Sequence, residues 1–237
     1  MHDSAGDDTL ITGPVYAELS GDGFKNIGTR FDEVYAYGSK GFDQARMFDS
    51  PGDDRFYTTS IYGALSGDGF HNQAEGFSSV NAYATAGGDD RAQMWDSAED
   101  DVFYGTPDES SLYHPGLYHH RAKHFEQVHA YATLGGNDRA DLFGSDNDDW
   151  YYGDDDESVL YDVGNTYMNR AKHFEEVNVY TDQAGTDTAL LVDATLEQGY
   201  SSLGEAVWLY DFETCLSKTG DDEPVSDLRL SMYEVSL

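Results

Sequence analysis

Apolar and polar residues alternate in short segments along most of the chain. In Val128–Tyr131, for example, a valine and an alanine alternate with a histidine and a tyrosine. A period of two residues, with β-branched and aromatic side chains, is typical of β-strands. No segment keeps the i, i+3, i+4, i+7 spacing of an amphipathic helix. The pattern therefore predicts an all-β protein with little helix.

The strand pattern recurs as a tandem repeat. The anchor Phe-x-x-Val begins at Phe31, Phe77, Phe125 and Phe174, so consecutive copies are 46, 48 and 49 residues apart. Each copy predicts a strand at the anchor, a second after a glycine turn and a third, aromatic strand after an acidic turn, followed by a variable loop. Short strands at a fixed long period predict a parallel β-solenoid (β-helix), in which each unit forms two coils of roughly 24 residues.

The repeats divide the chain into an array and a terminal segment. The array spans residues 1–197, with units near 3–30, 31–76, 77–124, 125–173 and 174–197. Residues 198–237 match no upstream unit, and the alternation of Leu228, Leu230 and Met232 predicts a closing strand. Because the last unit of a solenoid must cover an exposed core edge, we interpret residues 198–237 as a C-terminal cap.

One polar column is expected inside the solenoid. Asn26, Asn72 and Asn169 occupy equivalent positions, and His120 stands in the same column. Stacked amide side chains form hydrogen-bonded ladders along repeated strands. We therefore predict an inward amide ladder that His120 interrupts.

An excess of acidic residues limits the partners. The 237 residues contain 13 Lys and Arg against 46 Asp and Glu, a formal net charge of −33. Nucleic acids and anionic membranes bind clustered cations, so we expect neither as a partner. No apolar run reaches the length of about 18 residues that membrane insertion needs. The charge favours cations as partners, although a solvated halophile-type surface has the same balance, and 14% aromatic residues argue against disorder.

Clustered aspartates recur at one turn of successive units. Like charges this close repel each other unless they are neutralised. Ca²⁺ takes six to eight oxygen ligands at about 2.3–2.6 Å and suits such turns. The candidate ligands are the turn aspartates and one aspartate near each glycine turn: Asp7, Asp8, Asp43, Asp49, Asp53, Asp54, Asp90, Asp96, Asp100, Asp101, Asp138, Asp148 and Asp149. We predict calcium sites with dissociation constants on the order of 10⁻⁴–10⁻³ M.

A structural alternative exists for these aspartates. Aspartate side chains also close turns by accepting hydrogen bonds from nearby backbone N–H groups. The degenerate unit lacks the pattern, because Thr186 and Thr188 replace the acidic and arginine positions and no aspartate pair follows Asp193.

The segment from Gly135 to Asp148 carries a resemblance to a known family. Gly135–Asp138 (GGND) and Leu142, followed by Gly144 and Asp148, resemble the RTX-type (haemolysin-type) calcium repeat, in which calcium binds between coils. The whole array resembles the tandem Asp/Gly-rich repeats of very large secreted bacterial surface proteins. The resemblance implies a secreted, extracellular or cell-surface location. Since the chain enters a repeat by Asp3, we interpret it as part of a longer protein.

Basic residues gather beside tyrosines in two consecutive units. Because residues two apart in a strand share a face, these cations and tyrosines could bind a uronate or sulfated glycan. A polysaccharide lyase needs such cations and a Lys, His or Tyr base that takes the C5 proton. The candidates are Tyr118, His120, Arg121, Lys123, Tyr167, Arg170 and Lys172. Alternatively, the cations pair with facing acids and the tyrosines belong to the core, which recurrence in two units favours.

The sequence therefore favours a secreted, calcium-stabilised β-solenoid module with a structural, adhesive or glycan-contacting role. Calcium and an extracellular polysaccharide are its candidate partners. The alternative is a polysaccharide lyase acting on an acidic, uronate-containing glycan, and only this alternative makes the chain an enzyme.

Overall fold

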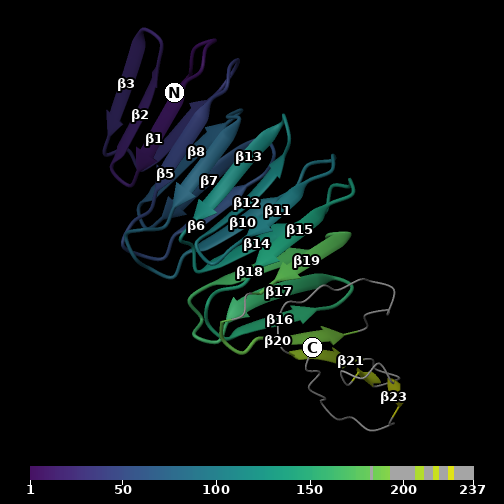
Figure 1. The fold of residues 1–237 in the computed structure, drawn as a ribbon. Helices are drawn as coiled ribbons and strands as arrows, with labels where there is room; N and C mark the ends of the chain where they lie inside the picture. Colours follow the sequence, from purple (N-terminus) through teal and green to yellow (C-terminus); the bar gives the residue numbers. More distant parts are fainter. Residues whose placement is uncertain (182–183, 193–205, 211–215, 219–223, 227–237) are drawn as a thin grey trace.

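The chain folds into a β-solenoid whose strands stack along the long axis of the molecule (Figure 1). The structure, a computed structural model, describes residues 1–181, 184–192, 206–210, 216–218 and 224–226. Within these residues it contains strands and no helix. The all-β solenoid predicted from the repeat is confirmed.

Two large sheets face each other across the core. Sheet I has 10 strands in the order β19-β15-β11-β12-β13-β9-β5-β1-β2-β3, and sheet II has 11 in the order β21-β20-β16-β17-β18-β14-β10-β6-β7-β8-β4. The strands of sheet I are β1 (Thr9–Gly13), β2 (Tyr16–Gly21), β3 (Phe24–Thr29), β5 (Gln44–Phe48), β9 (Ser79–Tyr83), β11 (Val102–Gly105), β12 (Glu109–His114), β13 (Tyr118–Lys123), β15 (Arg139–Phe143) and β19 (Glu176–Tyr180). The strands of sheet II are β4 (Glu33–Tyr37), β6 (Arg55–Thr58), β7 (Tyr62–Gly67), β8 (Phe70–Glu75), β10 (Arg91–Trp95), β14 (Gln127–Tyr131), β16 (Asp149–Gly153), β17 (Glu157–Asp162), β18 (Met168–Lys172), β20 (Thr188–Val192) and β21 (Ala206–Tyr210). A separate two-stranded sheet contains β22 (Leu216–Lys218) and β23 (Pro224–Ser226).

Each repeat contributes an antiparallel meander of three strands and two single strands. The meanders are β1–β3, β6–β8, β11–β13 and β16–β18. Strands of different coils pair in parallel, as β10 does with β6 and β14. The chain crosses between the sheets three times in each repeat. Because this number is odd, consecutive meanders lie on opposite sheets.

The segment predicted as a variable loop is a pair of strands. In the second meander, β7 and β8 pair antiparallel and are joined by Asp68 and Gly69. Gly69 has a φ of +77°, in the left-handed region that glycine adopts easily. An Asp-Gly pair between alternating segments is a hairpin signal. A repeat therefore makes three crossings and a three-stranded meander with two hairpins, rather than two equal coils.

Large apolar side chains fill the space between the sheets. Met47, Met94 and Leu142 occupy equivalent positions in three units, and each is 0% exposed. The anchor rings Phe77 and Phe125 also pack inside, with Phe125 6.1 Å from Phe56 between ring centroids, whereas Phe31 of the first anchor is 59% exposed. These contacts join residues far apart in sequence, so each unit is covered by its neighbours.

The predicted amide ladder is not formed. Equivalent residues of consecutive units lie on opposite sheets, so Asn72, His120 and Asn169 cannot stack on one another. Each is 1% exposed and instead reaches a backbone carbonyl across the core. The contacts are Asn72 Nδ2 to Gly13 O at 3.1 Å, His120 Nε2 to Thr59 O at 2.9 Å, and Asn169 Nδ2 to Thr106 O at 2.9 Å. Asn26, in the edge strand β3, is exposed.

The C-terminal boundary is less sharp than the repeat pattern indicates. Strand β21 pairs in parallel with β20, so sheet II continues beyond residue 197 into the predicted cap. The predicted closing strand around Leu228, Leu230 and Met232 lies outside the described residues.

Candidate functional site: the acidic turns

The second aspartate of each acidic turn closes that turn. Asp54 Oδ2 accepts hydrogen bonds from the Ser50 backbone N–H at 2.7 Å and from Ser50 Oγ at 2.9 Å. The equivalent pairs are Asp8 with Ser4, Asp101 with Ser97 and Asp149 with Ser145. All four aspartates are at most 1% exposed. A Ser-x-x-x-Asp spacing therefore builds a turn around a buried carboxylate.

The buried aspartates also join consecutive coils. The Asp8 N–H donates to Asp43 Oδ1 at 2.9 Å. The same bond joins Asp54 to Asp90, Asp101 to Asp138 and Asp149 to Asp187. The sequence prediction placed Thr186 at this acidic position, which is wrong by one residue. Aligning Asp187-Thr188-Ala189 with Asp138-Arg139-Ala140 identifies Asp187.

The first aspartate of each pair lies at the rim of the stack. Asp7, Asp53, Asp100 and Asp148 are exposed. Each accepts a backbone N–H from the next coil: Asp7 from Phe42 at 2.8 Å, Asp53 from Asp89 at 3.0 Å, Asp100 from Asn137 at 2.9 Å and Asp148 from Thr186 at 2.7 Å. These bonds join consecutive coils, whereas the bonds that the turn-closing alternative predicts are those of the second aspartates with the serine of their own turn. Each carboxylate has about four lone-pair sites, so such bonds leave sites for a cation.

A third aspartate precedes the turn in three units. Asp49 Oδ2 accepts the Ala86 N–H at 2.6 Å, and Asp96 Oδ2 accepts the Thr133 N–H at 2.7 Å. In the first unit this residue is Asp3, which accepts the Ser39 N–H. The sequence prediction did not include Asp3 among the metal ligands.

The first turn brings three carboxylates together. Among the residues that the structure describes, Asp3, Asp8 and Asp43 form the one group of three whose ligand oxygens all lie within 4.8 Å of one another. Asp8 and Asp43 are each 1% exposed, and Asp3 is partly exposed. Three converging oxygen donors are the chemistry that a hard divalent cation prefers.

Burial makes the charged form of these carboxylates costly. The pKa of Asp90 is raised to about 7, first by burial and then by the nearby Glu126 and Asp54. Burial, with neighbouring carboxylates, likewise raises the pKa of Asp138 to about 6. Burial is also the main cause that raises the pKa of Asp43, which Asp3 and Asp8 raise further. A proton or a bound cation would remove this cost.

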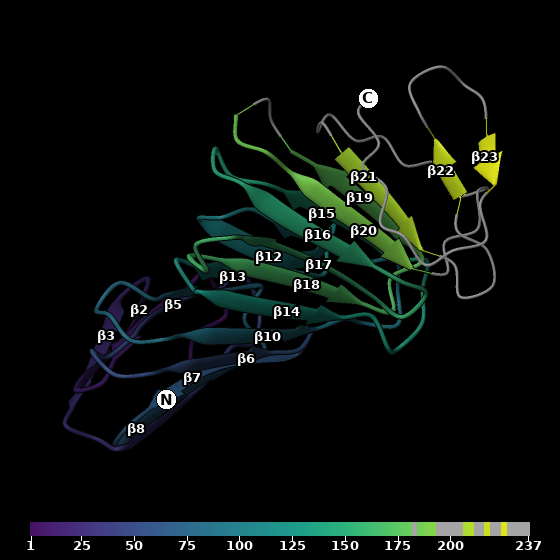
Figure 2. The ribbon, with the colours of Figure 1, turned by 90° about the horizontal axis from the view of Figure 1, so that it is seen from below.

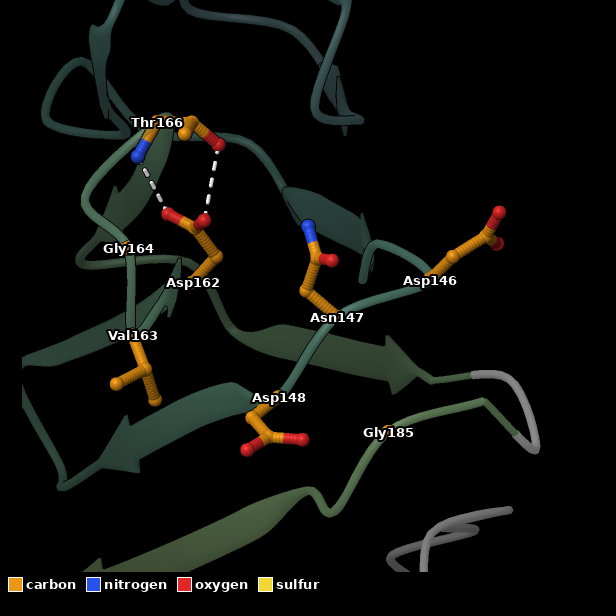
Figure 3. A pocket seen from close by; sticks show the side chains of 8 residues that line it. All are labelled: Asp146, Asn147, Asp148, Asp162, Val163, Gly164, Thr166 and Gly185. Carbon is orange, nitrogen blue, oxygen red and sulfur yellow. Dashed lines mark hydrogen bonds between the residues drawn. The ribbon is translucent and has the colours of Figure 1, made fainter.

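A surface pocket lies beside the fourth acidic turn (Figure 3). Its volume is about 520 Å³, and its lining includes Asp146, Asp148 and Asp162. The Asp162 carboxylate accepts Thr166 Oγ1 at 2.9 Å. In Figure 3 the three carboxylates point in different directions, so they do not form a cage like that of the first turn.

The candidate lyase residues are divided between the inside and the outside of the solenoid. Side chains alternate along a strand, so Tyr118 and His120 point into the core, with 4% and 1% exposure, whereas Arg121 and Lys123 face outward. Tyr118 Oη donates to Asp101 Oδ1 at 2.8 Å, and the equivalent Tyr167 Oη donates to Asp149 Oδ1 at 2.7 Å. Both tyrosines are therefore parts of the acidic turns.

The two basic pairs lie on different sheets. Arg121 and Lys123 extend from β13 in sheet I, and both lie beside Glu109, at 3.6 and 3.7 Å. Arg170 and Lys172 extend from β18 in sheet II, where Arg170 pairs with Glu157. The structure does not gather the seven candidates into one site, and no contact among them favours the lyase alternative.

Comparisons with known proteins do not identify these turns. Within the part of the chain that the structure describes, no helix is long and apolar enough to cross a membrane. The resemblance to RTX-type repeats stays a prediction. In comparisons with known proteins, no family model, no curated protein and no solved structure matches the chain.

Proposed function

We propose that this chain is a calcium-stabilised β-solenoid module of a secreted or cell-surface protein, with a structural or adhesive role. The observation that carries the proposal is the convergence of Asp3, Asp8 and Asp43 within 4.8 Å at a turn where two of the three are buried. The extracellular location rests on the resemblance of the repeats to those of secreted bacterial surface proteins.

Calcium fits the chemistry of the turns. The available donors are carboxylate and carbonyl oxygens, which Ca²⁺ binds in flexible geometries. A bound divalent cation would offset the burial and the like-charge repulsion that raise the pKa of Asp43. At ten times its dissociation constant, calcium would stabilise the fold by about 1.4 kcal/mol for each site.

A structural role fits the repetition of the turns. The same carboxylate-to-backbone bonds recur between successive coils, at Asp8–Asp43, Asp54–Asp90, Asp101–Asp138 and Asp149–Asp187. A catalytic site is normally made once, whereas a device that stabilises stacking is needed in each unit. Cation binding here would couple directly to folding, since the ligands come from two consecutive coils.

The test is thermal unfolding of the full chain in EDTA and in millimolar calcium, with magnesium and a monovalent salt of matched ionic strength as controls. We expect a rise in the unfolding midpoint that is specific to calcium. Asp43→Asn should remove much of the rise that the first turn supplies. Asp22→Asn, in an exposed hairpin, is the matched control and should keep the full rise.

Two outcomes would contradict the proposal. An equal response to calcium, magnesium and the monovalent salt would identify plain screening of the net charge of −33. A calcium-specific rise that Asp43→Asn and Asp22→Asn change equally would place the cation elsewhere.

A further inference from the structure

The outward surface of sheet II carries a group of basic strands without acidic residues. Strands β6, β10, β14 and β18 are hydrogen-bonded neighbours and lie side by side in Figure 2. Their sequences, RFYT, RAQMW, QVHAY and MNRAK, contain no aspartate or glutamate. They hold four of the 13 basic residues of a chain with 46 acidic ones. We call the outward side chains of these four strands the basic face.

Strand alternation places the basic residues on the outside. In β10, Ala92 and Met94 are 0% exposed in the core, so Arg91, Gln93 and Trp95 face outward. Arg91 bonds Gln127 Oε1 through Nε at 3.1 Å and through Nη2 at 2.6 Å. The Arg91 guanidinium is therefore hydrogen-bonded to a neutral side chain, which does not compensate its positive charge.

A pair of stacked aromatic rings stands next to these cations. The Trp95 and Tyr131 rings have centroids 4.3 Å apart and planes at 13°. Because the ring faces are turned toward each other across two strands, the ring edges face outward, and the edge of an aromatic ring is its positive part. Lys172 lies directly opposite Tyr131 in the next strand.

Three nitrogens at this face have no hydrogen-bond partner. Trp95 Nε1, His129 Nε2 and Arg170 Nε are covered by neighbouring side chains and are unpaired among the described residues. Unpaired buried polar groups cost free energy, which a ligand rich in acceptor oxygens would recover once the covering side chains rotate. Burial is the main cause that lowers the pKa of His129 to about 4; Arg91 and Arg170 lower it further, and Glu157 opposes them.

We propose that the basic face binds an acidic polysaccharide, with uronate carboxylates against Arg91 and Lys172, and against Arg170 once it exchanges its pairing with Glu157 of the neighbouring strand β17. This inference rests on the proposed surface role but not on bound calcium. The neutral amides of Gln93 and Gln127 would meet sugar hydroxyl groups between the carboxylates. A nucleic acid suits the face less, because its dense phosphate charge would meet the acidic turns on both sides of the sheet.

Sheet I offers a matched surface for comparison. Strands β5 and β9 carry the equivalent stacked pair, Phe48 and Tyr83, with centroids 5.1 Å apart. Phe48 stands where sheet II has Trp95, and Asn81 stands where it has His129. The Asn81 amide already donates to Ser79 Oγ at 3.1 Å. Strands β5 and β9 therefore have no tryptophan or histidine at these positions, and the unpaired nitrogens described in sheet I, His114 Nδ1 and Arg121 Nε, lie in β12 and β13.

The experiment measures binding of the full chain to a hyaluronan oligosaccharide, a uronate polymer, by isothermal titration calorimetry in millimolar calcium. The control ligand is the same oligosaccharide with its carboxyl groups reduced to alcohols. Arg91→Gln combined with Arg170→Gln alters the basic face. Arg46→Gln combined with Arg121→Gln makes the same charge change on sheet I. Thermal unfolding of each variant, with and without calcium, reports on folding and on the proposed calcium role separately.

We expect the sheet II double variant to weaken binding at least tenfold and the sheet I double variant to weaken it less than about threefold. Carboxyl reduction should abolish binding. Equal weakening by the two double variants would identify general charge attraction and overturn the proposal, as would binding that survives carboxyl reduction. A DNA oligonucleotide that binds as tightly through the same arginines would also overturn it. So would self-association in sedimentation that Arg91→Gln with Arg170→Gln abolishes.

Discussion

The first two acidic turns and the last two hold the same buried carboxylate in different ways. In the first two, Asp8 and Asp54 lie against a hairpin glycine: an ideal Cβ would be 1.5 Å from Asp8 Oδ1 at Gly21, and 1.7 Å from Asp54 Oδ1 at Gly67. In the last two, Asp101 and Asp149 accept a tyrosine hydroxyl. The aromatic residue of the hairpin is Phe24 or Phe70 in the first pair, and Tyr118 or Tyr167 in the second.

This difference shows that one position in a repeat can be stabilised either by shape or by a hydrogen bond. A hydroxyl donor supports the charged carboxylate directly, whereas a glycine only leaves room for it. The inner oxygen of the first two turns therefore keeps more capacity for another ligand. The group of three carboxylates within 4.8 Å lies in this half, at Asp3, Asp8 and Asp43.

The largest effect is expected from Gly67→Ala, which fills the space beside the Asp54 carboxylate. Its Cβ would also lie 2.6 Å from Phe70 Cε1, so both the carboxylate and the ring must move. We expect a loss of about 3 kcal/mol in the free energy of unfolding, measured by urea denaturation. His114→Ala is the control, because His114 occupies the equivalent hairpin position in the third unit. A similar loss in both variants would show that the glycine is not needed for the carboxylate.

A second prediction concerns His120, which stands in the third unit where its neighbours have asparagine. Burial is the main cause that lowers the pKa of His120 to about 4, below the usual value near 6.5. The unfolded chain therefore binds the proton more readily, and stability falls as the pH drops from about 6.5 toward 4. His120→Asn should remove roughly 3 kcal/mol of this pH-dependent loss. Parallel pH profiles for the two proteins would contradict the prediction.

A third, smaller effect is expected from Tyr167→Phe. The variant removes the hydroxyl that donates to Asp149 and should cost about 1.5 kcal/mol at neutral pH. Burial raises the pKa of Asp149 and the Tyr167 hydroxyl lowers it, so the variant raises this pKa further. A carboxyl with a raised folded pKa regains stability as the pH falls, so the loss should shrink between pH 8 and pH 5. Tyr104→Phe, at an exposed ring, is the control for denaturation at both pH values.

The smallest effect is expected at the exposed aspartates. Asp53→Asn and Asp100→Asn keep an oxygen that can accept the same N–H from the next coil. Each should change the free energy of unfolding by less than about 0.5 kcal/mol in EDTA, equally in the two halves. A larger loss for Asp53→Asn only when calcium is present would extend the cation site to the rim of the second turn.

The alternating strands and the tandem period were readable from the sequence because both depend on local spacing. The hairpin hidden in the predicted loop was not recognised, although Gly67-Asp68-Gly69 carries its signal. The turns there differ in length between units, with two residues between β7 and β8 and three between β12 and β13, so no turn motif is common to all units in the alignment. The amide column was correctly predicted to be buried at Asn72 and Asn169, but these side chains do not form the predicted ladder.

The acidic turns illustrate the same limit at the candidate site. The aspartate spacing identified nearly all of the carboxylates that link the coils, and it missed Asp187 through a one-residue shift. It could not show which of them converge, because Asp43 comes from the coil after the turn that holds Asp3 and Asp8. The tyrosines of the basic segments were candidates for catalysis, and the structure uses Tyr118 and Tyr167 as hydroxyl donors inside the turns.

Spacing within a unit predicts the alternating strands outside the hairpin, the tandem repeat and the positions of the acidic turns. The sheet on which each unit lies depends on how the chain crosses the whole solenoid. Three crossings for each repeat place consecutive meanders on opposite sheets, which separates Arg121 from Arg170 and gathers Arg91 and Arg170 on one face. This arrangement arises because each repeat makes an odd number of crossings between the sheets. The number of crossings depends on how the chain closes each coil, so it cannot be deduced from the residue spacing of one unit.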